Sequence, residues 1–298
     1  MRGAISRWLQ CQFLFLVSAV VRLLPRRLSL SLGSGIGLLF HRFSRSRREI
    51  TLDHLRYALK DETSETTRER IARDCYKHFG RLITDTLWLF PQKRERLDRL
   101  IKVRGQEHIQ KAYDSGRGVL LFSGHFGHWE LVALYQGYLG MPLGLVTRPI
   151  DNPSVEHFLA DLRCRSGNEV IHKRNATRRI VRRLREGGGV AIVIDQDQGD
   201  RAIFVPFFGR LASTTPTLAS LALKTGAAII PTYALPTPEG GYEIVYGPEV
   251  TLDPLLEVDC RVTALTAKCT AILEGWIRER PECWLWMHRR WKSTPRER

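Results

Sequence analysis

Residues 118–134 read Gly-Val-Leu-Leu-Phe-Ser-Gly-His-Phe-Gly-His-Trp-Glu-Leu-Val-Ala-Leu, a short apolar run followed by a glycine-rich corner and a second apolar run. The first run has the length of a buried strand, and the second begins a helix at Trp129. Gly124 and Gly127 permit a tight corner between the two, because glycine adopts backbone angles that other residues avoid. The stretch is therefore predicted to form one strand–turn–helix unit.

His125 and Glu130 lie on either side of this corner. Residues five positions apart on a helix are separated by about 140°, so the corner, and not a helical face, must bring them together. A carboxylate that accepts a hydrogen bond from one imidazole nitrogen leaves the other nitrogen able to take a proton. We predict that His125 is a general base and that Glu130 orients it; the alternative is a pair of capping or surface residues. Since the chain has no Gly-x-Ser-x-Gly nucleophile motif, the base is expected to activate a hydroxyl of the substrate.

The composition indicates an anionic partner. The 298 residues include 46 Lys and Arg against 31 Asp and Glu, which gives a formal charge of +15. The arginines are scattered, and no zinc-finger, RNA-recognition or leucine-zipper pattern accompanies them, so nucleic acid is not the expected partner. The six cysteines form no Cys-x-x-Cys pair, which favours a reducing compartment.

The N-terminal region has the character of a membrane anchor. Residues 8–24 are mostly apolar but contain Gln10, Gln12 and Arg22, and they are shorter than the roughly 20 residues of a clean membrane span. We expect a marginal transmembrane helix or an interfacial one; the alternative is a helix packed on the protein itself. Arginines are denser after this run than before it, which places the body in the cytoplasm. The predicted organisation is a membrane-anchoring helix with a basic linker over residues 1–48 and a catalytic domain over residues 49–298.

Strands and helices alternate through the body of the chain. This order predicts an α/β fold with a mostly parallel central sheet flanked by helices. Because ligands collect at the carboxyl ends of parallel strands, His125, Arg148 and Asp195 are expected to share one site. The expected strands span residues 118–123, 143–147, 169–172, 190–195, 227–233 and 242–246.

A metal site is the main alternative for the histidines. His125 and His128, with Glu130 or Asp195, could act as metal ligands of a hydrolase. Their spacing is not the His-Glu-x-x-His of zinc enzymes, and the acidic run 195–200 lacks the glycine position and final glutamate of a calcium loop. We therefore expect no metal and no cofactor.

Several short motifs occur in a fixed order along nearly the whole chain. Beside the His125 corner they are Thr147-Arg148-Pro149, Asp195-Gln196, Val205-Pro206-Phe207-Phe208-Gly209, Thr214-Thr215-Pro216 and the stretch from Trp284 to Lys292. In this order they resemble the bacterial lipid A biosynthesis acyltransferases of the lauroyl- and myristoyltransferase type, within the glycerolipid acyltransferase superfamily that has a His-x4-Asp/Glu motif. Around Asp53 the chain departs from the family, because His54 stands where an asparagine is common.

The resemblance implies an inner-membrane enzyme whose active site faces the cytoplasm. Such an enzyme moves a fatty acyl chain from acyl carrier protein to a hydroxyl of a lipid A precursor, an anionic glycolipid. His125 and Glu130 would then be catalytic, and Arg148 would help to stabilise the oxyanion. Substrate-binding roles are expected for further residues, with the two phenylalanines on the acyl-chain path or in the core: Asp195, Gln196, Phe207, Phe208 and Thr214. Other readings are an acyltransferase for a lysophospholipid or ornithine-type lipid, a metal-dependent hydrolase, and a membrane-binding module without catalysis.

Overall fold

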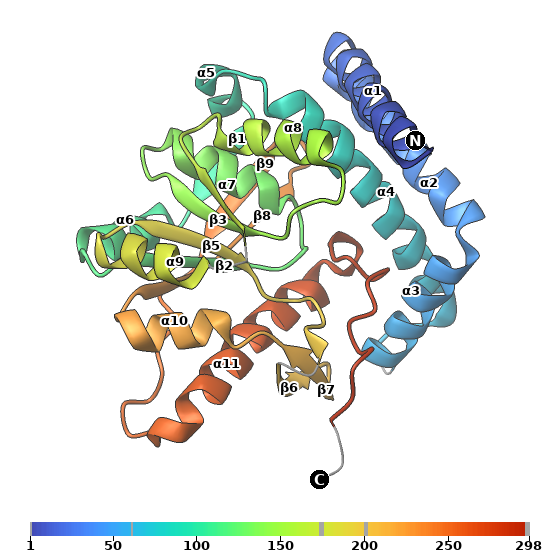
Figure 1. The fold of residues 1–298 in the computed structure, drawn as a ribbon. Helices are drawn as coiled ribbons and strands as arrows, with labels where there is room; N and C mark the ends of the chain where they lie inside the picture. The colour runs from blue at the N-terminus through green and yellow to red at the C-terminus, as the bar shows by residue number, and fades with distance from the viewer. Residues whose placement is uncertain (1, 61, 173–175, 200–201, 296–298) are drawn as a thin grey trace.

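The computed structural model describes residues 2–60, 62–172, 176–199 and 202–295 (Figure 1). Its centre is a seven-stranded sheet of order β1-β9-β8-β2-β5-β3-β4, and β6 and β7 form a separate antiparallel pair. The strands are β1 (Ile101–Arg104), β2 (Val119–Ser123), β3 (Leu143–Thr147), β4 (Glu169–His172), β5 (Gly189–Val193), β6 (Ile203–Phe207), β7 (Arg210–Thr214), β8 (Ala228–Pro236) and β9 (Tyr242–Tyr246). The helices are α1 (Arg2–Leu23), α2 (Arg26–Phe43), α3 (Arg45–Ala58), α4 (Glu65–Leu89), α5 (Arg94–Asp98), α6 (Gln106–Asp114), α7 (Trp129–Tyr138), α8 (Pro153–Cys164), α9 (Ala176–Arg185), α10 (Thr217–Thr225) and α11 (Val258–Glu279).

The predicted α/β sheet is confirmed, and it is mostly parallel. Only β8 and β9 pair in the antiparallel sense among the neighbouring strands of this sheet. Every strand expected from the sequence is present within a few residues, whereas β1 and the β6–β7 pair were not anticipated. The carboxyl ends of β2, β3 and β5 precede His125, Arg148 and Asp195, as the pattern of strands predicted.

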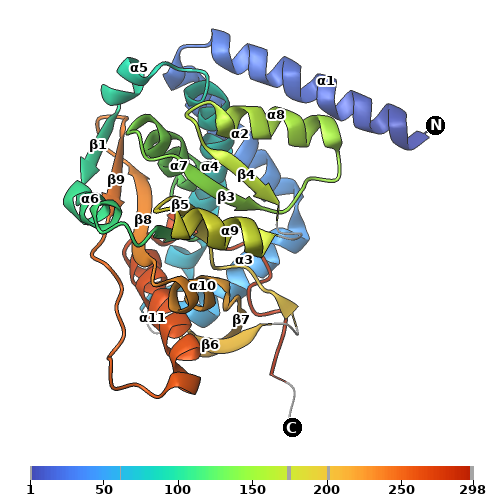
Figure 2. The ribbon, with the colours of Figure 1, turned by 60° about the vertical axis from the view of Figure 1, so that its left-hand side comes forward.

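Helices cover both faces of the sheet (Figures 1 and 2). Along β2, Leu120 and Phe122 belong to the core that contains residues of α9, α10 and α11. Val119 and Leu121 belong to the second core, which contains residues of α6, α7 and α8. Because side chains alternate between the faces of a strand, the nearly unbroken apolar run of β2 supplies both cores.

The helix α2 packs along α4 through residues without bulky side chains. A Cβ atom on Gly33 would lie 2.5 Å from the carbonyl oxygen of Gly80, and one on Gly37 would collide with the backbone of Tyr76. Ser29 is buried on the same side of α2. Helix α2 is therefore folded against the body of the protein.

A buried ion pair fixes the start of α2 to α4 and β9. Arg26 donates to both carboxylate oxygens of Asp85, at 2.8 and 2.6 Å, and Tyr242 donates its hydroxyl proton to the same carboxylate at 2.7 Å. Asp85 is fully buried. Three segments that are distant in sequence therefore converge on one carboxylate.

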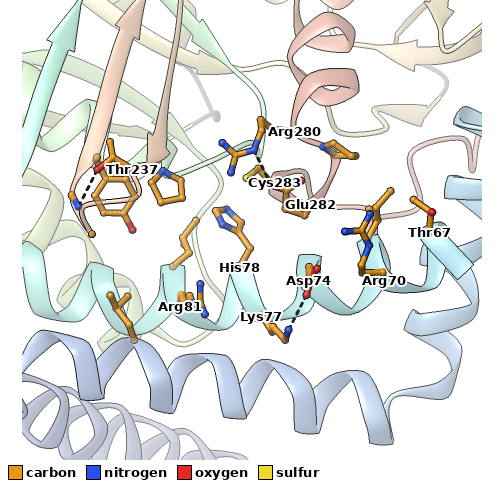
Figure 3. A pocket seen from close by; sticks show the side chains of 18 of the residues that line it. Thr67, Arg70, Asp74, Lys77, His78, Arg81, Thr237, Arg280, Glu282 and Cys283 are labelled. Carbon is orange, nitrogen blue, oxygen red and sulfur yellow. Dashed lines mark hydrogen bonds and ion pairs between the residues drawn. The ribbon is translucent and has the colours of Figure 1, made fainter. Parts of the chain in front are cut away.

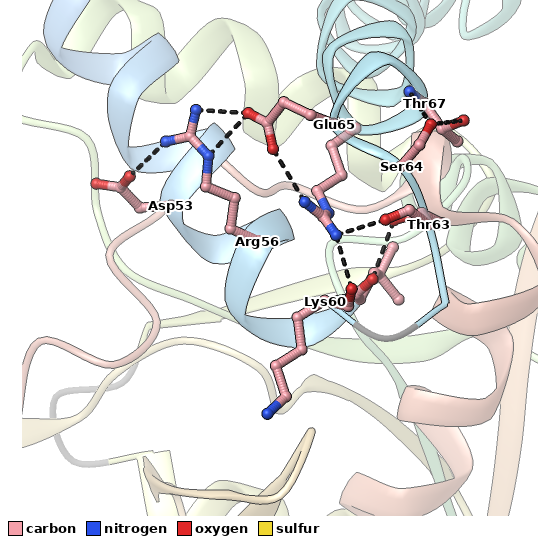
Figure 4. A network of polar contacts seen from close by, with 9 residues as sticks. Asp53, Arg56, Lys60, Thr63, Ser64, Glu65 and Thr67 are labelled. Atoms are coloured by element: carbon pink, nitrogen blue, oxygen red, sulfur yellow. Dashed lines mark hydrogen bonds and ion pairs between the residues drawn. The ribbon is translucent and has the colours of Figure 1, made fainter.

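Polar contacts also define the turn between α3 and α4 (Figure 4). The Ser64 hydroxyl caps α4 by accepting from the amide of Thr67 at 3.2 Å. Glu65 accepts from Arg56 at 2.6 Å and from Arg68 at 2.9 Å. These contacts set the entry of the chain into α4.

None of the described helices is long and apolar enough to cross a membrane. The expectation of a marginal span over residues 8–24 is thus corrected in part, since α1 contacts α4 and α8. Large apolar side chains nevertheless stay exposed on α1 and α2, and the most exposed are Leu16, Leu23, Leu28, Leu39 and Phe43.

Removal of the buried charge at residue 85 should loosen this attachment. We expect Asp85→Asn to lower the free energy of unfolding by about 3–5 kcal/mol, because Arg26 would keep its charge in a mostly buried position without a counter-ion. Denaturant titration followed by circular dichroism measures this change. Glu49→Gln, which breaks an exposed ion pair with Arg45, is the matched control and should leave the midpoint unchanged. Equal midpoints for the two variants would contradict the role given to Asp85.

Candidate active site

The corner between β2 and α7 requires its glycines. A Cβ atom on Gly124 would lie 2.8 Å from the methyl groups of Leu273 and 3.0 Å from Oδ2 of Asp195. Gly127 has φ of +58°, and a side chain there would collide with the carbonyl of Ala234. The corner is thereby packed closely against β8 and α11.

Backbone hydrogen bonds hold the corner to two other segments. Gly127 donates to the carbonyl of Cys283 at 2.9 Å, and Leu285 donates to the carbonyl of His125 at 3.1 Å. His128 donates its amide proton to Ala234 at 2.8 Å. The residues after α11 therefore act as a strap across the loop that carries His125.

His125 is oriented by Asp195. The His125 Nδ1 lies 2.8 Å from Asp195 Oδ1, and the His125 amide donates to Oδ2 of the same carboxylate at 2.8 Å. The indole of Trp284 donates to Oδ2 at 2.7 Å. With Nδ1 protonated and bonded to Asp195, Nε2 carries the lone pair that can accept a proton.

The environment keeps Asp195 ionised. Burial opposes its charge, but the His125 imidazole and the hydrogen bonds from His125 and Trp284 outweigh burial and lower the pKa of Asp195 to about 2. The carboxylate is therefore charged at neutral pH and can stabilise the imidazolium that forms when Nε2 takes a proton.

Glu130 lies in the same site but forms a different pair. Its carboxylate accepts from Nε of Arg163 at 3.0 Å and from Nη2 of the same guanidinium. Burial lowers the pKa of Arg163, but the hydrogen bond and charge of Glu130 more than offset this and raise it. The expectation that Glu130 orients His125 is corrected here, because the carboxylate bonded to Nδ1 belongs to Asp195.

His128 has a structural position. It is fully buried, its Nδ1 accepts from the amide of Leu131 at 3.2 Å, and it thereby caps α7. The alternative of a metal site used His128 as a ligand, but this residue caps a helix instead. In the described part of the chain, no group of three His, Cys, Asp or Glu is arranged to hold a metal ion.

His125 lines a cavity of about 340 Å³. The cavity lies between β2, β3 and β5 on one side and α7 on the other, and its polar residues include His125, Glu130, Arg148, Arg163, Gln196 and Gln198. Its apolar wall includes Leu121, Val132, Ala133, Leu143, Leu145 and Ala191. Gln196 approaches His125 closely, with its side-chain nitrogen 3.3 Å from Nε2. The cavity therefore joins a proton acceptor, two arginines and an apolar chamber.

Three expected substrate contacts lie elsewhere. Phe207 and Phe208 are buried against Trp284, Trp286 and Trp291 instead of lining the cavity. Thr214 is fully buried and accepts from the guanidinium of the equally buried Arg290. The core alternative therefore describes the two phenylalanines, and the aromatic cluster supports Trp284 from behind.

The sequence pattern missed Arg163 and the contact of Trp284 with Asp195. Arg163 lies on α8 and had no motif around it, while Trp284 was part of a motif without an assigned partner. The only indication of a role for Arg163 in the sequence was its positive charge in a helical segment.

Comparison with known proteins indicates one protein family. Residues 3–293 match the family model described as "Bacterial lipid A biosynthesis acyltransferase". The chain is 30% identical to the lipid A biosynthesis lauroyltransferase of Escherichia coli K12, over 97% of this chain and 92% of the relative. It is 29% identical to the palmitoleoyltransferase of the same organism, over 91% and 87%. A phosphatidylinositol mannoside acyltransferase of Mycolicibacterium smegmatis is 25% identical over 46% of this chain and 47% of its own length.

The buried imidazole of His128 should make folding sensitive to acid. Burial lowers its pKa from 6.5 to about 4, so between these pH values the unfolded chain binds a proton that the folded chain does not. The free energy of unfolding should then fall as the pH drops through this window, by about 3 kcal/mol from this residue. We expect His128→Asn, which retains a capping acceptor, to flatten the dependence measured by urea titration at several pH values. His157→Asn, at an exposed position, should leave the pH dependence of the free energy of unfolding as in the wild type. An unchanged pH dependence for His128→Asn would contradict the low pKa assigned to His128.

Proposed function

Since the chain belongs to the bacterial lipid A biosynthesis acyltransferase family and is an acyltransferase, we propose that it moves a fatty acyl chain from acyl carrier protein to a hydroxyl of a lipid A precursor. One observation carries the proposal. The imidazole of His125 is bonded to a buried carboxylate through Nδ1, and the same residue lines a cavity with an apolar wall. This arrangement suits proton removal from a hydroxyl beside a bound fatty chain.

The proposed reaction uses His125 as the general base. Its Nε2 takes the proton of the acceptor hydroxyl while the oxygen attacks the thioester carbonyl, which becomes a tetrahedral oxyanion. Asp195 stabilises the imidazolium through Nδ1 and is a positioning residue. When the carbon–sulfur bond breaks, the thiolate leaves and can take the proton back from Nε2. The products are an ester and the free thiol of the carrier.

Donors for the oxyanion come from the polar side of the cavity. Arg148 lies there at the end of β3, and the Gln196 amide adjoins Nε2. We assign Glu130 the role of holding Arg163 at the cavity wall, where the guanidinium favours negative charge. In this proposal Glu130 acts through Arg163, and Asp195 takes the role once given to Glu130.

The apolar wall is the proposed place of the acyl chain. A volume of about 340 Å³ lies within the range of small-molecule sites, roughly 300–1,000 Å³. Each buried methylene contributes about 0.8 kcal/mol, so the depth of the wall can select the chain length. Substrate contact by Phe207, Phe208 and Thr214 is not part of this proposal.

We also propose that the exposed apolar side chains of α1 and α2 lie in the cytoplasmic face of the inner membrane. On α2 they occur at Leu28, Leu32, Ile36, Leu39 and Phe43, opposite the small residues that pack on α4. Exposed arginines such as Arg22 and Arg27 stand beside them and favour anionic headgroups. The helices would rest on the membrane with the catalytic domain in the cytoplasm.

A second acceptor class has one observation in its favour. The chain resembles phosphatidylinositol mannoside acyltransferases over about half its length. The alternative is therefore that the acyl acceptor is another glycolipid instead of a lipid A precursor. Mass spectrometry of lipid A from cells that express the chain separates the two, because only the first acceptor adds acyl mass to lipid A.

The role of Asp195 can be tested by kinetics. We expect Asp195→Asn to lower kcat by about 10²–10⁴ with a small change in KM, because the amide can neither hold the tautomer nor offset the imidazolium charge. The rate of acyl transfer from radiolabelled acyl carrier protein measures this change. Asp197→Asn is the matched control, since this carboxylate binds Ser293 instead of His125, and it should retain activity. A fully active Asp195→Asn enzyme would refute the arrangement.

The acyl-chain assignment predicts a change of selectivity. A larger residue at Ala133 fills part of the cavity, so Ala133→Leu should shift the preference toward chains shorter by a few carbons. Competition between acyl donors of different length, with the products resolved by mass spectrometry, measures the shift. Ala271→Leu, on the exposed face of α11, is the control. An unaltered product distribution for Ala133→Leu would place the chain elsewhere.

A further inference from the structure

A second and larger cavity lies behind the catalytic loop (Figure 3). Its volume is about 690 Å³, and it is formed by α4, the start of α2, the turn between β8 and β9, and residues 280–283. As the described residues line them, this cavity and that of His125 have no residue in common. The proposed reaction uses none of its side chains.

The lining of this cavity carries an excess of positive charge. Five cationic side chains and two carboxylates line it, namely Arg26, Arg70, Lys77, Arg81 and Arg280 with Asp74 and Glu282. The charge of Arg26 is balanced by Asp85, so Arg70 and Arg81 are the described cations of the lining without a carboxylate partner. The carboxylates are already engaged, with Asp74 2.8 Å from Lys77 and Glu282 2.8 Å from Arg280. Among the described residues, Arg70 has no hydrogen bond or ion pair. A partner of negative charge is therefore the missing component.

The cavity also has apolar parts and a fixed end. Leu30, Ile71 and Leu82 contribute apolar surface beside the cations. Thr63 and Thr67 lie at the end of the cavity where the network around Ser64 and Glu65 sets the start of α4. A preformed wall of arginines and threonines suits a phosphate group, because guanidinium groups bind its oxygens in pairs.

The inner wall of this cavity touches the catalytic loop. His78 lies in the wall, and its Nε2 is 3.3 Å from the carbonyl oxygen of Gly127. Burial lowers the pKa of His78 to about 4, so the ring is neutral and donates one proton to that carbonyl. Cys283, which also lines the cavity and lies close to His78 in Figure 3, accepts with its carbonyl oxygen from the amide of Gly127 at 2.9 Å. Both peptide groups of Gly127 are thus held by residues that line the cavity.

From this geometry we propose that the cavity binds a phosphate-bearing ligand between Arg70 on α4 and Arg280 on the strap after α11, and that the bound ligand stiffens the loop of His125. The phosphate can belong to a small soluble molecule or to a lipid headgroup. The ligand bridges the two segments that hold Gly127, so its binding reduces their motion relative to each other.

Calorimetry of the full chain in uncharged detergent tests the binding. The two probes are inorganic phosphate and the water-soluble dihexanoyl phosphatidic acid, both titrated at constant ionic strength. We expect Arg70→Glu to weaken the binding at least tenfold and Arg70→Gln to weaken it less. Arg73→Glu, three positions along the same helix and outside the cavity lining, should change it less than twofold.

The two probes distinguish the source of the phosphate. Equal affinity indicates recognition of the phosphate group alone, whereas much tighter binding of phosphatidic acid indicates a lipid headgroup. Absence of binding by both probes, or equal weakening by Arg70→Glu and Arg73→Glu, would overturn the proposal. Hydrogen exchange supplies the second readout. Amides of residues 124–128 should exchange more slowly with the ligand bound, and unchanged exchange under saturation would overturn the coupling to the loop.

Discussion

The Asp195 carboxylate accepts three hydrogen bonds, and the rest of the site depends on them. Its donors are the amide and imidazole of His125 and the indole of Trp284, so the ends of β2 and β5 and the C-terminal segment meet at one group. A buried carboxylate stays charged only when such donors surround it, and each donor is immobilised in return. The orientation of the His125 imidazole therefore depends on the packing of the C-terminal segment, because both bind the same carboxylate.

Helix α4 supports this arrangement from behind. Cys75 donates to the carbonyl of Trp284, and His78 donates to the carbonyl of Gly127. The same helix carries Gly80 and Asp85, which receive α2. One helix thus connects the proposed membrane-facing elements with the loop of the general base.

The sequence predicted the sheet, the His125 corner and the position of Arg148 and Gln196 from local patterns. A carboxylate partner for His125 was predicted correctly, but the predicted residue was Glu130, which is five positions away along the chain. The carboxylate that binds Nδ1 belongs to Asp195, which is 70 positions away. Spacing along the chain carries no information about such a contact, and neither does it reveal that Arg163 binds Glu130. The burial of Phe207, Phe208 and Thr214 likewise arises from tertiary packing around three tryptophans. The sequence therefore indicated which residues have reactive side chains, whereas the contacts between these side chains depend on the tertiary fold.

The small-residue face of α2 has a consequence for biosynthesis. Ser29, Gly33 and Gly37 lie on the buried face of α2, which packs on α4, yet residues 65–89 of α4 are synthesised after those of α2. During that interval, the small-residue face of α2 has no helix to pack against. At a synthesis rate of roughly 5–20 residues per second, the nascent helix waits for seconds without its partner.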